Sequence, residues 1–235
     1  MNESSFRTQS LVLCSVRFFR SRSHFDACWG RNRCVDVCVV TVLDVLEETK
    51  IAGNTLVVFS SDNGGALEVG ANNGKLRSGK GTMYEGGLRV PSIARWIGTI
   101  KPGIETTVDA TTADLFPTFL EVAHCEIRPR QSLDGVSLMP VFLGREAEMP
   151  RRDFYFIRRE GGAPFFGLTS ETLLSGGWKL VHNSPTSPLE LFDLSNDPYE
   201  QTDLAKQEPE RFAKMFRTLQ LHLQQGGRVP WQPPE

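Results

Sequence analysis

The stretch Thr55-Leu-Val-Val-Phe-Ser-Ser-Asp-Asn-Gly-Gly65 decides the fold class of this chain. Its first six residues form a continuous apolar and β-branched run, which is typical of a buried strand in a parallel sheet. Residues 37–46 carry apolar side chains at helical spacing, and residues 51–54 predict a turn before the strand. Helix, turn and buried strand in succession favour an α/β sheet.

Asp62 and Asn63 follow directly after this predicted strand. Ligands of α/β sheets bind beyond the carboxyl ends of strands, and carboxylate and amide oxygens suit Ca²⁺ or Mg²⁺. Asp-Asn-Gly is also a common turn sequence, and a calcium site needs roughly six to eight oxygen ligands. A metal site completed by other residues and a plain turn therefore both remain open.

A glycine-rich segment runs from Asn73 to Thr82, and in it Gly74, Gly79 and Lys80 have the spacing of a phosphate-binding loop. Such a loop needs a following helix whose N-terminus faces the phosphates. Residues 84–91 contain paired glycines and a proline, so we expect no such helix. We predict instead a loop that presents Lys80 to another tetrahedral oxyanion.

The next block, Glu85-Gly-Gly-Leu-Arg89, suggests two structural features. The paired glycines permit close approach of another backbone segment. Arg89 stands four residues after Glu85, so the two can form a salt bridge, or Arg89 can reach the site.

The later chain predicts an α+β arrangement. We expect a helix over 115–123, with Thr111 or Thr112 as N-cap, short antiparallel strands at 154–157, 177–182 and 189–194, and a last helix over 212–223. Residues 36–150 are therefore interpreted as a partial α/β domain. Residues 151–235 are interpreted as a small C-terminal subdomain with a Pro-rich tail.

Composition narrows the functional classes. The chain has 235 residues, 40% of them hydrophobic, and a net charge of −2, which disfavours nucleic-acid binding by bulk charge. No apolar run reaches the length of about 18 residues that a membrane-spanning helix needs.

Residues 1–35 differ from the rest: six Arg against two acidic residues give this segment a net charge of +4. We interpret it as an anomalous, non-native N-terminal segment, without an evident signal peptide. The five cysteines do not suggest a disulfide framework, and His24, Cys28, Cys34 and Cys38 fit no standard zinc spacing.

In order and spacing, these blocks resemble the formylglycine-dependent sulfatases, the family of arylsulfatase A and N-acetylgalactosamine-6-sulfatase. Later landmarks that agree are Asp114-Leu-Phe-Pro-Thr118, Leu133-Asp-Gly-Val-Ser-Leu138, Trp178-Lys-Leu180 and Leu191-Phe-Asp-Leu-Ser-Asn-Asp-Pro198. The resemblance implies the C-terminal part of an alkaline-phosphatase-like α/β domain, followed by a small antiparallel sheet packed with a helix. It also implies a sulfuric ester hydrolase acting on a sulfate ester or sulfated glycan.

The resemblance further implies roles for matching residues. Asp62 and Asn63 are similar to two ligands of the family's calcium ion, and Lys80 is similar to the lysine that contacts the sulfate in catalysis and substrate binding. Family members are often secreted, periplasmic or lysosomal.

The departures from the family pattern concern the nucleophile. The family makes formylglycine from the cysteine of a Cys-x-Pro-x-Arg motif, and the nearest approach here, Cys14-Ser-Val-Arg17, lacks the proline. An upstream Asp-Asp calcium pair is also missing. We therefore expect a truncated, C-terminal sulfatase half with an incomplete calcium site, inactive as this chain. The alternatives are a non-catalytic remnant that binds sulfated glycans, and a phosphatase or phosphodiesterase of the alkaline phosphatase superfamily.

Overall fold

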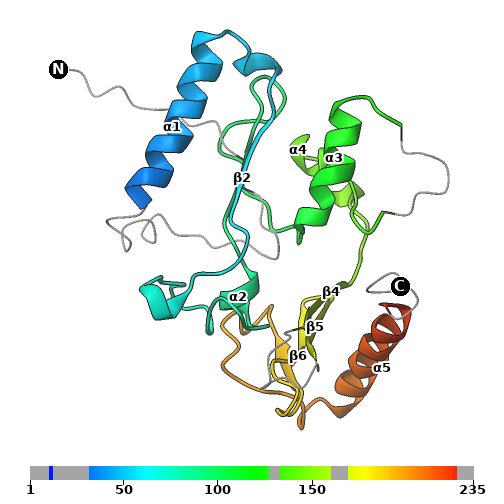
Figure 1. Cartoon of the computed structure of the whole chain (residues 1–235). Helices are drawn as coiled ribbons and strands as arrows, with labels where there is room; N and C mark the ends of the chain where they lie inside the picture. The colour runs from blue at the N-terminus through cyan, green and yellow to red at the C-terminus, as the bar shows by residue number, and fades with distance from the viewer. Residues whose placement is uncertain (1–10, 13–31, 127–132, 160–168, 227–235) are drawn as a thin grey trace, which may run out of the picture. The chain divides into compact units, whose positions relative to one another are not determined.

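A computed structural model describes residues 11–12, 32–126, 133–159 and 169–226 (Figure 1). The chain divides into two compact units. The first comprises Met1–Asn72 and Leu88–Pro150, and the second comprises Asn73–Gly87 and Arg151–Glu235. The short segment 73–87 thus belongs with the C-terminal part of the chain.

The first unit contains helix α1 (Asn32–Glu48) and a sheet of three strands in the order β1-β3-β2. The strands are β1 (Leu11–Val12), β2 (Val57–Ser60) and β3 (Ser92–Arg95). The predicted helix and strand are confirmed. The expected parallel pairing is wrong for the described strands, because β3 pairs antiparallel with both β1 and β2. All four residues of β2 are only half-buried, so full burial is wrong as well.

Helix α3 (Leu115–Val122) follows the 3-10 turn Thr112–Asp114. Thr111 and Asp114 form a capping box there, as the sequence predicts for Thr111, and the carboxylate of buried Asp114 also accepts a hydrogen bond of 2.9 Å from the N–H of Val136. Helix α4 (Met139–Phe142) completes a core formed by Ala94, Ile100, Ala110, Leu138, Val141 and Phe142. Three further 3-10 turns span Ala52–Asn54, Leu67–Val69 and Glu146–Glu148.

The second unit is an antiparallel sheet in the order β4-β5-β6-β7, with helix α5 packed on one face (Figure 1). The elements are β4 (Phe154–Arg159), β5 (Thr169–Ser175), β6 (Trp178–His182), β7 (Glu190–Asp193) and α5 (Pro209–Gly226). Leu173, Leu180 and Leu191 pack against Met215 and Leu219 of the helix. The three predicted strands and the last helix are confirmed, whereas β5 was not predicted.

Helix α2 (Glu85–Leu88) is a four-residue helical turn within residues 84–91, where the sequence predicts no helix of a phosphate-binding loop. It is a single turn that contains both glycines, which is possible because they pack directly against other backbone. A Cβ on Gly86 would lie 2.2 Å from the carbonyl oxygen of Ser78, and one on Gly87 would lie 2.3 Å from that of Thr82. The predicted close approach at this glycine pair is therefore confirmed.

No helix in the described part of the chain is both long and apolar enough to cross a membrane.

Candidate functional site

The four-stranded sheet of the second unit has two different faces, because successive side chains of a strand alternate. Leu173, Leu180 and Leu191 point to the face that α5 covers. Their neighbours Thr172, Lys179 and Glu190 therefore belong to the opposite face. This opposite face, called the loop face below, binds the segment 73–87.

A buried ion cluster on the loop face fixes the end of this segment. The ammonium Nζ of Lys179 on β6 lies 2.9 Å from a carboxylate oxygen of Glu85 and 2.8 Å from one of Glu200. The backbone N–H of Glu85 donates to the other oxygen of Glu200 at 2.7 Å. All three side chains are almost completely buried, so their mutual contacts replace contacts with water.

The cluster holds one cation and two acidic groups, an uneven balance in a buried site. Burial raises the pKa of the Glu200 carboxyl, and the neighbouring Glu85 raises it further, while Lys179 opposes both effects. Among the described residues, Oε2 of Glu85 has no hydrogen-bond partner, and Oε1 of Glu200 has its ion-pair contact with Lys179. Glu200 also has a left-handed backbone conformation, φ 56°. Breaking this cluster would leave uncompensated buried charge, which is costly.

A second set of contacts ties the preceding residues to the same face. Arg77 forms an ion pair of 3.1 Å with Glu190 of β7, and its guanidinium stacks 3.8 Å from the centre of the Tyr84 ring. The Tyr84 hydroxyl donates to Glu190, and the backbone N–H of Met83 donates to Oδ1 of Asn183 at 2.7 Å. Burial, together with Glu190, raises the pKa of Tyr84 to about 12.

Lys80 lies in the tight turn between these anchored residues. Gly79 is buried, and its carbonyl accepts hydrogen bonds from the N–H and the hydroxyl of Thr82 at 3.1 and 2.8 Å. Gly81 has φ 90°, a conformation that favours glycine, while Lys80 itself is exposed. The turn therefore presents an ammonium group to solvent from a backbone held on both sides.

Asp62 and Asn63 lie in a bend after β2, in the first unit. Asp62 is exposed, and the backbone carbonyl of Asn63 accepts a hydrogen bond of 2.9 Å from the Ser61 hydroxyl. The position directly after a strand agrees with the sequence-based placement.

These two residues do not make a complete calcium site. Among the residues that the structure describes, no group of three or more His, Cys, Asp or Glu side chains could hold a metal ion. Asp62 and Asn63 offer two side-chain oxygens, and calcium takes roughly six to eight oxygen ligands. Of the residues considered as zinc ligands, Cys38 is a free, exposed thiol. His24 and Cys28 lie outside the described residues.

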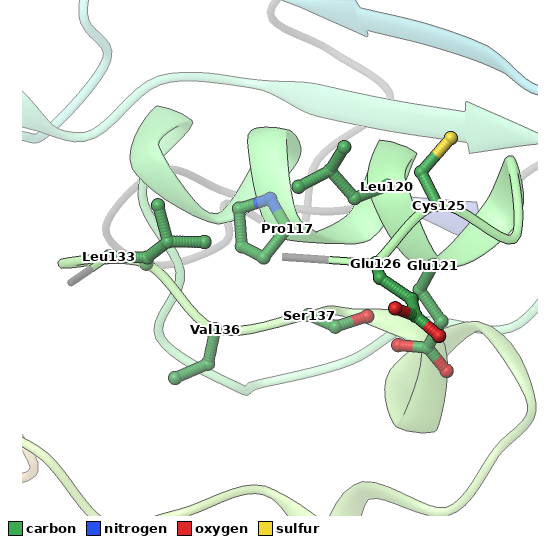
Figure 2. Close-up of a pocket in the computed structure, with 9 residues that line it drawn as sticks. Pro117, Leu120, Glu121, Cys125, Glu126, Leu133, Val136 and Ser137 are labelled. Atoms are coloured by element: carbon green, nitrogen blue, oxygen red, sulfur yellow. The ribbon is translucent and has the colours of Figure 1, made fainter. Parts of the chain in front are cut away.

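A separate pocket of about 600 Å³ lies in the first unit beside α3 (Figure 2). Its walls come from Pro117, Leu120 and Glu121 of α3, from residues 125–126, and from residues 133 and 135–137. None of the predicted site residues, Asp62, Asn63 and Lys80, lines this pocket.

Sequence reasoning missed Lys179 and Glu200, although both stand in or beside the quoted landmarks. The signal is weak because the partners are far apart in the chain: Glu85 and Lys179 are separated by 94 residues. The predicted pairing of Glu85 with Arg89 stays a prediction, while Glu85 binds Lys179.

Two family models match the chain. Residues 9–125 match the model described as sulfatase, and residues 78–227 match the model described as N-sulphoglucosamine sulphohydrolase, C-terminal. The first match begins within the segment 1–35.

The curated relatives are sulfatases. N-acetylgalactosamine-6-sulfatase of Sus scrofa is 42% identical over 49% of this chain and 23% of its own length. Arylsulfatase A of Bos taurus is 33% identical over 72% of this chain and 37% of its own length. The chain thus spans well under half the length of these relatives.

A solved structure, that of Ps i-CgsB in complex with k-i-k-neocarrahexaose, superposes with a TM-score of 0.71. It is 32% identical in sequence, and the match covers 79% of this chain and 40% of that one.

Proposed function

Because this chain belongs to the sulfatase family, we propose that it carries the sulfate-contacting part of a sulfuric ester hydrolase. Lys80 would bind the sulfate group, and Asp62 and Asn63 would supply two of the calcium ligands. The observation that supports this most is the anchoring of the Lys80 turn. Arg77, Met83, Tyr84 and Glu85 on either side of Lys80 all bind side chains on or beside the sheet.

Such an arrangement would place the positive charge of Lys80 before the sulfate ester reacts. A sulfate ester accumulates negative charge on its oxygens as the ester bond breaks, and an ammonium group already in position stabilises that charge without reorganisation. Lys80 needs a fixed backbone for this purpose, since its own side chain is flexible. The buried contacts of Glu85 and Tyr84 provide that backbone.

We further propose that the chain alone does not hydrolyse sulfate esters. Sulfatases generally use calcium and a formylglycine, and the Cys-x-Pro-x-Arg motif that yields formylglycine is absent from the sequence. A covalent mechanism that loses its nucleophile retains little of its rate. The chain should therefore bind sulfate without turning over a sulfate ester.

Calorimetric titration with sodium sulfate and an assay with a chromogenic aryl sulfate test both statements. We expect sulfate to bind, Lys80→Ala to weaken binding by about tenfold, as a charge-assisted contact predicts, and no turnover with or without calcium. Lys206→Ala is the matched control, because Lys206 is an exposed lysine of the same unit.

Two results would contradict the proposal. Equal sulfate affinity in the wild-type chain and Lys80→Ala would remove Lys80 from the site, and turnover by the wild-type chain would show that another nucleophile exists. A chromogenic aryl phosphate is assayed in parallel, since its hydrolysis would favour the phosphatase alternative.

A further inference from the structure

Arg158 of β4 lies against the turn that carries Lys80. A Cβ built on Gly81 would lie 2.8 Å from Nη1, 3.2 Å from Nη2 and 3.3 Å from Cζ of Arg158. The whole guanidinium group is therefore packed beside the Cα of Gly81, the residue next to Lys80. The φ of 90° favours glycine at this position, and the guanidinium of Arg158 fills the space that a Cβ would take.

The strand register explains how Arg158 reaches this place. Tyr155 of β4 packs with the leucines that α5 covers, so Arg158, three residues later, belongs to the loop face. Arg158 pairs across the sheet with Ser170 of β5. The regular geometry of the sheet thus puts Arg158 on the loop face, and the conformation of its side chain brings the guanidinium to Gly81.

Two cationic residues of the second unit therefore adjoin Gly81, Lys80 along the chain and Arg158 through space. Neighbouring like charges repel each other, and an anionic ligand relieves that repulsion. Lysine supplies a single flexible charge, whereas the planar guanidinium binds the paired oxygens of a sulfate or carboxylate with defined geometry. Arg158 makes at least one further interaction within the structure, and a guanidinium carries five N–H donors in all.

We propose that Arg158 binds a second oxyanion of the same ligand, so that the site selects sulfated sugars that carry another sulfate or a carboxylate group. This inference rests on the proposed function, in which Lys80 binds the first sulfate. Arg158 acts here as a specificity-determining residue and takes no part in bond breaking.

The test is calorimetric titration of the whole chain with four ligands at low ionic strength. Inorganic sulfate and N-acetylglucosamine 6-sulfate offer one sulfate, glucosamine 2-N,6-O-disulfate offers two, and glucuronic acid 2-sulfate offers a sulfate and a carboxylate. The variants are Arg158→Gln, Arg158→Lys, Lys80→Ala and the control Arg151→Gln, an exposed arginine just before β4.

We expect Arg158→Gln to weaken one or both doubly anionic ligands by about tenfold and to leave the two singly sulfated ligands unchanged. Whichever doubly anionic ligand loses affinity identifies the second group as sulfate or carboxylate. Arg158→Lys should recover only part of the loss, and Arg151→Gln should cause none. Circular dichroism and the thermal midpoint check that each variant is folded.

The outcomes separate this inference from the proposed function. If Lys80→Ala weakens inorganic sulfate while Arg158→Gln alters all four ligands equally, or none, the role of Arg158 is wrong and that of Lys80 stands. If Lys80→Ala leaves inorganic sulfate unchanged, the proposed function fails, whatever Arg158 does. If the wild-type chain binds none of the ligands, both are wrong.

Discussion

Lys179 is a fully buried lysine, and its ammonium contacts two buried carboxylates. Removing one partner of a buried ion pair costs more than the pair contributes, because the remaining charge stays desolvated. Here the remaining charges are those of Glu85 and Glu200, and they would repel each other without the lysine.

We therefore expect Lys179→Met to lower the free energy of unfolding by about 3–5 kcal/mol, measured by urea denaturation. Lys206→Met at an exposed position of the same unit should change it by less than about 0.5 kcal/mol. A loss below about 1 kcal/mol in Lys179→Met would contradict the expected cost of leaving these buried side chains without their ion-pair partner.

Two tyrosines of the second unit predict a stability change at alkaline pH. Burial is the first cause that raises the pKa of both Tyr84 and Tyr155 from 10.0 to about 12, followed by Glu190 for Tyr84 and Glu171 for Tyr155. The folded state thus favours the protonated phenols. Stability should be unaffected by these groups below pH 10 and should fall as the pH rises from 10 towards 12.

Ultraviolet titration of phenolate at equilibrium measures the pKa values of these two phenols directly. Tyr84→Phe and Tyr155→Phe should each remove one late-titrating group, and Glu190→Gln should lower the pKa of Tyr84. Titration of all three tyrosines near pH 10 in the folded chain would contradict the assignment.

The one-turn helix α2 shows how an element depends on its packing. Gly86→Ala would place a methyl group 2.2 Å from a backbone oxygen of Ser78, and Gly86 directly follows Glu85, which binds the buried Lys179. We expect a loss of about 2–3 kcal/mol in thermal or urea unfolding. Gly53→Ala is the control, since nothing lies within 4 Å of its added Cβ. Equal effects of the two substitutions on the free energy of unfolding would show that the loss comes from backbone propensity and not from the close contact at Gly86.

Elements with regular side-chain patterns could be predicted from the sequence, and those set by distant contacts could not. Helix α5 and strand β6 have clear apolar periodicity, so local rules suffice. Strand β5 was missed because its first residues are polar, although they lie in the middle of the sheet. The antiparallel partner of β2 depends on the course of the intervening chain, which its apolar run does not encode.

The site could be predicted only in part for the same reason. Lys80 stands in a recognisable local motif, so its turn could be predicted. Arg158 could not, because its place beside Gly81 depends on the register of β4 against β5. A side chain such as Arg158, which packs against a turn from a distant strand, stands in no local motif that would reveal it.

At the scale of the whole molecule, helix α1 is unusual for its exposed valines. Val35, Val37, Val40, Val42 and Val45 are between 45% and 63% exposed. A helix that is apolar on several sides is normally covered by other protein. We expect the isolated chain to associate through α1, with an average mass above that of a monomer in sedimentation experiments.

The double substitution Val37→Lys and Val42→Lys should restore a monomer without loss of helix content in circular dichroism. Exchanging Thr107 and Thr186, two exposed positions outside α1, for lysine is the charge-matched control and should leave association unchanged. A wild-type chain that is monomeric at all concentrations would show that α1 is covered within the chain.

The assignment of residues 73–87 to the second unit has a consequence for synthesis of the protein. Glu85 is translated 94 residues before Lys179, and Arg77 is translated 113 residues before Glu190. At about 5–20 residues per second, the turn with Lys80 waits several seconds on the ribosome before its partners exist. During that interval Met83 and Tyr84 lack Asn183 and Glu190, the side chains that hold them in the folded chain.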